Sequence, residues 1–281
     1  MTFGINSFLF QSPFTNASLP LLKKFKDWGF DSVELPLEDI SHIDPALFKQ
    51  ALSDNGLVCA SFCGAFGPDR DLRGSKEAQQ NSVDYIKGLL DIMAEVGTPV
   101  LAGPLYSAVG RAEVTAPDEY KRQWDTVAKH LANLADYAGQ RNLRLAIEPL
   151  NRYETDFINV CSQAMKMVNE VNHDALGVLL DTYHMNIEEK NSAKAIQLAG
   201  DKLYHFHACG CDRGTPGNDH INWDEIVAAL KQVKYDAGIV IESFTTDVKV
   251  IAKAASIWRQ FEPSQEDIAV QGIKFLRSRF K

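Results

Sequence analysis

The sequence predicts an α/β protein whose fold class is a single (β/α)8 TIM barrel, and three observations support this. Short apolar runs that are typical of buried strands alternate eight times with longer amphipathic helices. The length of 281 residues suits an α/β barrel formed as one domain, residues 1–281, and no linker or low-complexity segment divides it. Alternation of this kind gives a parallel sheet. The count of eight favours closure into a barrel over an open doubly wound sheet.

Eight short apolar runs are the expected strands. Glycine, proline, asparagine or charged residues bound most of them, as is typical of strands that end in turns. The runs are residues 3–8, 31–36, 57–62, 99–103, 145–147, 178–182, 203–208 and 239–243. The fifth run opens the segment 144–155, which contains two of the site residues proposed below.

Caps and glycine stops set the limits of the expected helices. Asp44 is a favourable N-cap residue, and Pro45 follows it at the first helical position. Gly97 ends one long helix, and Pro117 lies in the first turn of the next. The expected helices are residues 20–28, 44–55, 75–96, 117–140, 161–171, 192–199, 223–234, 248–258 and a terminal helix that ends near 280.

Composition excludes several classes of partner. The formal net charge is −8 and no Lys/Arg cluster stands out, so neither nucleic acid nor an anionic membrane is an expected partner. No stretch approaches the roughly 20 apolar residues of a membrane span, and the N-terminus lacks the pattern of a signal peptide. The five cysteines fit neither a disulfide framework nor a CxxC metal site, so we expect reduced thiols in a cytoplasmic protein.

Four of the expected strands carry an ionisable side chain at or near their ends: Glu148, Asp181, His207 and Glu242. Each carboxylate alone would more often be a loop cap or an ion-pair partner. A barrel of this type, however, places its active site at the C-terminal strand ends, and consecutive strands are neighbours. Two Glu, one Asp and one His suit Mn²⁺, Co²⁺ or Mg²⁺, with positions left for water or substrate. A structural zinc site would instead be rich in Cys or His.

Three further polar residues follow these ligands by three to six positions, in expected loops over the barrel mouth: Glu154, His184 and Arg213. Glu154 and Arg213, taken singly, are typical of solvated loop charges. Together the three offer an acceptor, an imidazole and a fixed donor fork around a polar substrate. His205 faces the same side of its strand as His207 but deeper, and we interpret it as a hydrogen-bonded core histidine.

The residues that the chain lacks restrict its chemistry. It has no GxSxG motif, so a serine nucleophile of that type is unsupported. It also has no GxGxxG at a strand–helix junction, so a nucleotide cofactor is unsupported. What remains is metal-polarised acid–base chemistry on a carbonyl compound. Glu148 and Glu242, on the fifth and eighth strands, can remove a proton from one face of a carbon and return one to the other. A phosphorylated substrate stays an alternative, because barrels often bind phosphate after strands 7 and 8, where this chain has the glycine-containing loop 209–219.

At these residues the chain resembles the D-tagatose/D-allulose (D-psicose) 3-epimerases, including L-ribulose 3-epimerases, of the xylose-isomerase-like barrel superfamily. Four stretches carry the resemblance, which the eight-unit layout extends over the whole chain. They are Glu-Pro-Leu-Asn-Arg-Tyr-Glu-Thr-Asp at 148–156, Asp-Thr-Tyr-His-Met-Asn-Ile-Glu-Glu at 181–189, His-Phe-His at 205–207 with the Arg213 loop, and Glu-Ser-Phe at 242–244.

The resemblance implies one Mn²⁺- or Co²⁺-type ion per subunit, bound by the four strand-end residues. It implies Glu148 and Glu242 as the acid/base pair at C3 of a ketose. It also implies that Glu154, His184 and Arg213 hold the O1–O3 end of the open-chain sugar, and that the enzyme is a homodimer or homotetramer. The segment 103–108 lacks the tryptophan that some members have at the far end of the sugar, so the preferred ketose stays open.

The resulting hypothesis is a metal-dependent ketose 3-epimerase acting on free ketohexoses or ketopentoses through a cis-enediolate. The sugar pairs are of the D-allulose/D-fructose, D-tagatose/D-sorbose or L-ribulose/L-xylulose type. The alternatives are an aldose–ketose or hydroxypyruvate-type isomerase, and an epimerase of a phosphorylated ketose. A metal-dependent endonuclease of the same superfamily would need more histidines and a basic face. A non-catalytic sugar-binding barrel is the last alternative.

Overall fold

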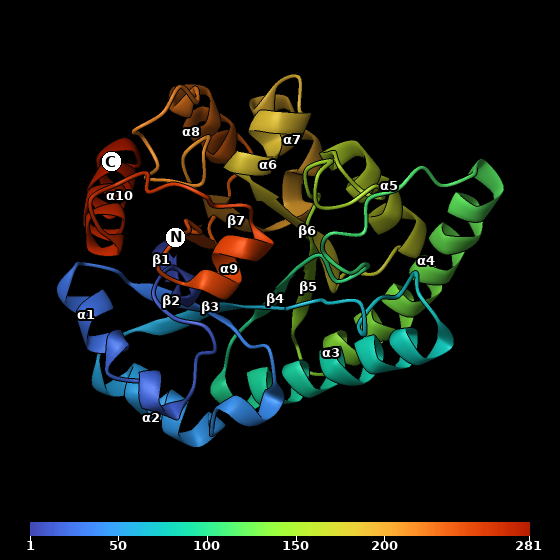
Figure 1. The fold of residues 1–281 in the computed structure, drawn as a ribbon, viewed down its shortest axis with the longest axis horizontal. Helices are drawn as coiled ribbons and strands as arrows, with labels where there is room; N and C mark the ends of the chain where they lie inside the picture. Colours follow the sequence, from blue (N-terminus) through green and yellow to red (C-terminus); the bar gives the residue numbers. More distant parts are fainter.

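Eight parallel strands close into a barrel in the computed structural model, which describes residues 1–281 (Figure 1). The strands follow one another around the barrel in chain order, and β8 pairs with β1. They are β1 (Thr2–Asn6), β2 (Ser32–Pro36), β3 (Val58–Cys63), β4 (Val100–Gly103), β5 (Arg144–Ile147), β6 (Leu176–Asp181), β7 (Leu203–Ala208) and β8 (Gly238–Ile241). The predicted (β/α)8 barrel is confirmed, and each expected strand overlaps an observed one.

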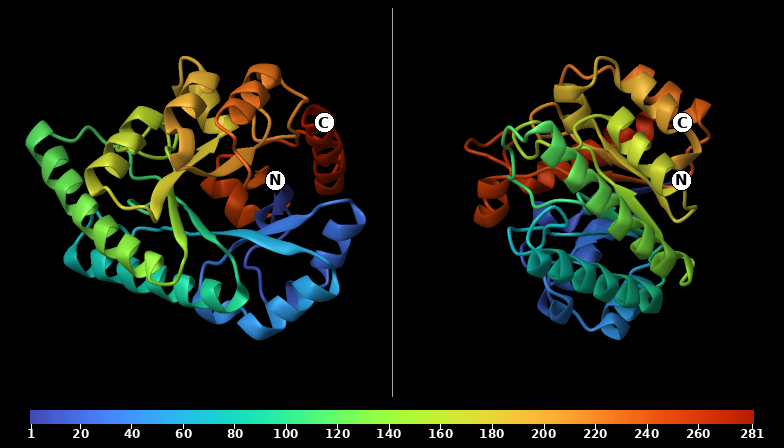
Figure 2. Two further views of the ribbon diagram at one scale, coloured as in Figure 1. Left: turned by 180° about the vertical axis from the view of Figure 1, so that it is seen from behind. Right: turned by 90° about the vertical axis from the view of Figure 1, so that its right-hand side faces the viewer.

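Ten α-helices lie in the connections between the strands and after β8, and they surround the barrel. They are α1 (Leu21–Asp27), α2 (Pro45–Asp54), α3 (Lys76–Val96), α4 (Pro117–Gly139), α5 (Cys161–Val171), α6 (Thr182–Glu188), α7 (Ser192–Ala199), α8 (Trp223–Gln232), α9 (Lys249–Ala254) and α10 (Gln265–Arg279). The two longest, α3 and α4, pack side by side along one flank (Figure 2). None of these helices has the length and apolar character needed to cross a bilayer.

Two helices differ from the sequence-based expectation. The α6 helix was not expected, and it places His184 in a helix rather than in a loop. It begins there because Asp181 is its N-cap, with the side chain accepting hydrogen bonds from the backbone amides of Tyr183 and His184. The α9 helix is shorter than expected and ends at Ala254, just before Ser256, which has a φ of +56° that a helix cannot include.

Alternation along the strands brings polar residues to the barrel interior. Leu145 and Ile147 of β5 belong to the large apolar cluster that fills the space between strands and helices. Ala146, between them, faces the other way, and Glu148 continues on the face of Ala146. A helix-covered parallel sheet thus places its apolar shell outside the barrel and its ionisable side chains toward the centre.

Candidate active site

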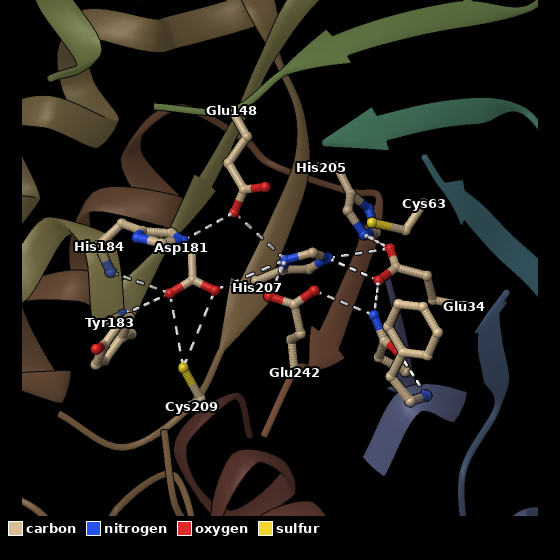
Figure 3. A network of polar contacts seen from close by, with 12 residues as sticks. Glu34, Cys63, Glu148, Asp181, Tyr183, His184, His205, His207, Cys209 and Glu242 are labelled. Carbon is tan, nitrogen blue, oxygen red and sulfur yellow. Dashed lines mark hydrogen bonds and ion pairs between the residues drawn. The ribbon is translucent and has the colours of Figure 1, made fainter. Parts of the chain in front are cut away.

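The structure places the four strand-end residues at one end of the barrel. Glu148 directly follows β5, Asp181 is the last residue of β6, and Glu242 directly follows β8. His207 is the penultimate residue of β7 and lies opposite Asp181 in the β6–β7 register. All four come from neighbouring strands, as the sequence predicts, and their side chains converge (Figure 3).

His207 lies at the centre of this group. Its Nδ1 atom is 3.2 Å from Glu242 Oε2, 3.7 Å from Asp181 Oδ2 and 3.8 Å from Glu148 Oε1. One ligating atom from each of the four residues lies within 4.8 Å of the others. No side chain of the four is more than 8% exposed to solvent. Three buried carboxylates this close together need positive charge to be stable.

The donor atoms of this group fit a divalent metal ion. Glu148 Oε1 and His207 Nδ1 are both buried, and neither has a hydrogen-bond partner. Buried polar atoms without a partner are rare in native proteins and call for a specific explanation. Three carboxylates and one neutral imidazole form the oxygen-rich set that Mn²⁺, Co²⁺ or Mg²⁺ prefers. A metal ion bound at this position would satisfy both atoms.

Arg213 lies inside the site, closer to the four residues than a loop over the mouth would place it. Its Nη1 donates to Asp181 Oδ2 at 2.8 Å and to Glu242 Oε2 at 2.9 Å. Its Nη2 is 2.9 Å from His184 Nε2. The Arg213 backbone has a φ of +70°, an uncommon conformation for a side-chain-bearing residue that often marks functional sites. Its fork therefore contacts two proposed ligands and one proposed substrate-binding residue.

Asn151 joins the other two predicted substrate-binding residues and was not singled out from the sequence. Its backbone N–H donates to His184 Nδ1 at 3.0 Å. Its side-chain Nδ2 donates to Glu154 Oε1 at 2.7 Å. Glu154 thus lies beside the cluster without belonging to it. The sequence contains Asn151 within the 148–156 stretch, but nothing in its spacing indicates a bridging role.

The surroundings shift the pKa values of these groups in different directions. Burial, reinforced by the charge of Glu242, raises the pKa of Glu148 well above its ordinary value. Burial also opposes ionisation of Glu242, but His207 and Arg213 outweigh it and lower that pKa. Burial lowers the pKa of His184 well below its ordinary value, and the Arg213 charge adds to this effect. Two carboxylates of the same type therefore differ in proton affinity because their neighbours differ.

A cavity of about 520 Å³ opens over the cluster. Glu148, Glu242, Glu154, His184 and Arg213 all line it, so the structure brings five of the seven predicted site residues to its wall. Its apolar side is formed by residues of several loops and of α9: Phe8, Phe66, Val109, Leu150, Phe244, Val250 and Ile251. This volume lies within the range of small-molecule sites and suits a monosaccharide.

Glu34 of β2 is the charged residue that sequence reasoning missed. It is fully buried, and its carboxylate contacts both His205 and His207 (Figure 3). Burial alone would raise the pKa of Glu34, but the two imidazoles and their hydrogen bonds lower it below its ordinary value. The available signal was a single carboxylate between Val33 and Leu35, in a strand whose other residues are uncharged. His205 is hydrogen-bonded and buried, as expected.

Comparisons with known proteins identify the family of the chain. The sequence model of the xylose isomerase-like TIM barrel family matches residues 22–279. The chain belongs to this family. Within it, the chain is 32% identical over 280 residues to a probable ketose 3-epimerase from Synechocystis sp., covering 99% of this chain and 96% of the relative. It is also 29% identical to an L-ribulose 3-epimerase from Methylomonas sp., over 90% of this chain and 88% of the relative.

Among solved structures, a D-allulose 3-epimerase from Methylomonas sp. in complex with D-allulose has the same fold. The TM-score is 0.92 at 27% identity, with 99% of this chain and 97% of that chain covered. These relatives are carbohydrate epimerases, which are isomerases. The resemblance inferred from the four sequence stretches is confirmed at the level of the family.

Proposed function

We propose that this protein is a metal-dependent ketose 3-epimerase that inverts C3 of free ketohexoses or ketopentoses through a cis-enediolate. One observation carries the proposal. Glu148 and Glu242, which follow β5 and β8, both reach His207 Nδ1, at 3.8 and 3.2 Å, at the floor of a cavity large enough for a sugar to lie between them (Figure 3). Two carboxylates on opposite sides of a reacting carbon are what removal and return of a proton with inversion requires.

The proposed cofactor is one Mn²⁺ or Co²⁺ ion per subunit, with Mg²⁺ as the alternative, held by Glu148, Asp181, His207 and Glu242. Such an ion, when bound, supplies Lewis-acid polarisation of a ketose carbonyl and stabilises negative charge on neighbouring oxygens. The chain's own carboxylates, Glu148 and Glu242, take the proton from C3 on one face and return a proton on the other. Which of the two acts as base depends on which epimer is bound.

Three residues are proposed to hold the O1–O3 end of the open-chain sugar. Glu154 accepts, Arg213 donates, and His184 presents its Nε2, because its Nδ1 already accepts the N–H of Asn151, so together the three can match a row of hydroxyl groups. All three line the cavity next to Glu148. Asn151 fixes two of them, because it donates to both His184 Nδ1 and Glu154 Oε1. Positioning of this kind lowers the entropic cost of bringing C3 between the two carboxylates.

The loop 209–219 favours a free sugar over a phosphorylated one. The amides of Gly210, Arg213 and Gly214 donate to acceptors within the loop itself. Those of Gly217 and Asn218 do the same. A phosphate cradle needs amides that point at the ligand, and these five are already used.

We further propose that residues 1–281 form one domain and that the enzyme is a cytoplasmic homodimer or homotetramer. All five cysteines are unpaired, which suits a reducing compartment. The oligomeric state is inferred from the family resemblance. Light scattering during size-exclusion chromatography tests it, because each chain has a mass of 31.2 kDa.

The experiment that tests the proposed function is a metal-dependent product assay. The protein is stripped with a chelator, reconstituted with Mn²⁺, Co²⁺ or Mg²⁺, and incubated with D-allulose, D-tagatose or L-ribulose. We expect the C3 epimer as the product, no turnover in the stripped protein and recovery with Mn²⁺ or Co²⁺. Full activity after stripping would contradict metal dependence, and an aldose as the sole product would contradict epimerisation.

A further inference from the structure

We propose that Glu34 is a positioning residue for the metal cluster. It receives the Nε2–H of His207 and thereby directs His207 Nδ1 toward Glu148, Asp181 and Glu242. The inference rests on the proposed function in one respect only, which is that this cluster binds a divalent ion. It concerns β2, a strand that supplies none of the proposed ligands.

The distances between His207 Nε2 and the Glu34 carboxylate show which ring nitrogen carries the proton. His207 Nε2 lies 2.9 Å from Glu34 Oε1 and 3.0 Å from Glu34 Oε2, so the imidazole faces both carboxylate oxygens. A neutral imidazole has one N–H donor and one acceptor nitrogen. A carboxylate can only accept, so the proton belongs on Nε2. Nδ1, which has no hydrogen-bond partner of its own, is left as the acceptor in the cluster.

The Glu34 carboxylate is itself fixed from three other sides. Asn6 Nδ2 donates to Oε1 at 2.7 Å, and Ser61 Oγ donates to Oε2 at 2.5 Å. His205 Nε2 lies 2.7 Å from Oε2. With His207, four groups therefore contact two oxygens that have about four acceptor sites between them. A fully buried carboxylate held in this way has little freedom to rotate, so the ring of His207 is fixed as well.

Asn6 extends the network to a second proposed ligand. The same Nδ2 that donates to Glu34 lies 3.2 Å from Glu242 Oε1 and donates to it. Asn6 belongs to β1, Glu34 to β2 and Ser61 to β3. Three strands without proposed ligands, β1, β2 and β3, thus hold the proposed ligands on β7 and after β8 in place. Carboxylate partners of this kind orient metal-binding histidines in other proteins, and their loss typically costs about 10- to 100-fold in metal affinity.

A competing interpretation uses the same atoms. Glu34, His205 and His207 each offer a ligand atom, and these atoms also lie within 4.8 Å of one another. A second metal ion there would need His207 to ligate through both ring nitrogens. The hydrogen-bond geometry favours the network over the second ion, because each Nε2 already lies at hydrogen-bond distance from the carboxylate. Metal stoichiometry separates the two interpretations.

The test compares Glu34→Gln with wild type and with Ser61→Ala. A glutamine has one acceptor oxygen, and its NH2 group would oppose a histidine nitrogen, so the orientation of His207 is lost. Ser61→Ala is the matched control, because it removes one donor to Glu34 and leaves both His207 contacts. We expect Mn²⁺ affinity, measured by electron paramagnetic resonance titration, to fall about 10- to 100-fold in Glu34→Gln. We expect a smaller fall in Ser61→Ala, because three of the four groups that contact the Glu34 carboxylate remain.

The second readout is the tautomer of His207, which needs only the wild-type protein and therefore stands even where a variant fails to fold. Long-range ¹H–¹⁵N spectra of ¹⁵N-histidine protein with Mg²⁺ should show a protonated Nε2 and an unprotonated Nδ1. A protonated Nδ1 would overturn the proposal, as would unchanged Mn²⁺ affinity in a folded Glu34→Gln.

Two Mn²⁺ ions per wild-type subunit, one of them lost in His205→Gln, would replace the proposed hydrogen-bond network with a second metal site. Absence of epimerase activity in a protein that binds Mn²⁺ would count against the proposed reaction and not against Glu34.

Discussion

Glu148 and Glu154 lie in the same loop after β5 but have different surroundings. Glu148 Oε1 is buried, lies 3.8 Å from His207 Nδ1 and has no hydrogen-bond partner. Glu154 Oε1 instead accepts the side-chain amide of Asn151 at 2.7 Å, outside the cluster. The same substitution at the two positions therefore has different expected results.

Glu148→Gln removes both a proposed ligand charge and a proton carrier. We expect kcat to fall by at least about 100-fold and Mn²⁺ affinity to weaken. Glu154→Gln keeps the cluster, so we expect Mn²⁺ affinity to be retained and KM to rise. Steady-state kinetics with calorimetric Mn²⁺ titration of both variants measures the difference. Equal effects of the two substitutions on metal affinity would show that the division of roles is wrong.

Arg213 supplies a planar fork that a lysine cannot reproduce. Its guanidinium contacts Asp181, Glu242 and His184 at the same time. We expect Arg213→Lys to lower kcat/KM about tenfold or more, because a point charge can satisfy fewer of these partners. Arg277→Lys is the control, since Arg277 is half-exposed and pairs with Asp31 away from the cavity. Similar kcat/KM losses in both variants would contradict a specific role for the fork.

At the scale of elements, the β6–α6 junction uses one side chain for two purposes. Asp181 ends β6, caps α6 through the amides of Tyr183 and His184, and contributes to the cluster. Asn caps helices about as well as Asp, but it brings no charge to a metal ion. Asp181→Asn should therefore keep the stability of α6 while losing Mn²⁺ affinity.

Asp181→Ala should lose both properties, with about 1 kcal/mol lost from the free energy of unfolding through the cap alone. Chemical denaturation of metal-free protein and Mn²⁺ titration test this pair of variants. An Asp181→Asn protein that binds Mn²⁺ like wild type would remove Asp181 from the proposed ligands.

The loops after β3, β4 and β5 are joined by one carboxylate. Asp156 Oδ1 accepts from the buried Arg73 at 2.6 Å, and its Oδ2 accepts from Thr115 at 3.0 Å. Burial alone would raise the pKa of Asp156, but Arg73 and Thr115 lower it below its ordinary value. Because its pKa is lower in the folded state, the Asp156 carboxylate stabilises the folded protein at pH values above its pKa in the unfolded chain. This contribution is lost as the pH falls through the two pKa values.

The free energy of unfolding of wild type should therefore exceed that of Asp156→Asn by a constant amount from pH 7 to about 5. This difference should shrink below about pH 4, where the unfolded chain begins to take up the proton first. Urea denaturation across pH measures it. A difference that grows on acidification would show that the sign of the Asp156 shift is wrong.

At the scale of the whole molecule, the barrel and its outer shell follow from local sequence patterns. Apolar runs such as 178–182 and 203–208 predict strands because a parallel sheet is buried on both faces. The convergence of the four proposed ligands follows from topology, since neighbouring strands in chain order bring their C-terminal ends together. Neither step requires knowledge of any long-range contact.

Other features depend on contacts that spacing does not reveal. Glu34 lies 173 positions before His207, and only barrel closure brings their side chains together. Asn151 becomes important because α6 turns His184 toward it, and α6 was itself missed because its start depends on the cap at Asp181. Arg213 enters the site through a left-handed backbone conformation that the sequence does not specify. The sequence thus predicts the proposed ligands better than the residues that hold them.

The proposed function depends on proton exchange at C3, and incorporation of solvent deuterium measures this exchange. The Mn²⁺-loaded protein is incubated with D-allulose in deuterated water, and the recovered sugars are analysed by NMR and mass spectrometry. We expect D-fructose with a single deuterium at C3, and no labelled product from Glu148→Gln or Glu242→Gln. An epimer formed without solvent deuterium, or an aldose labelled at C2 in place of the C3 epimer, would contradict it.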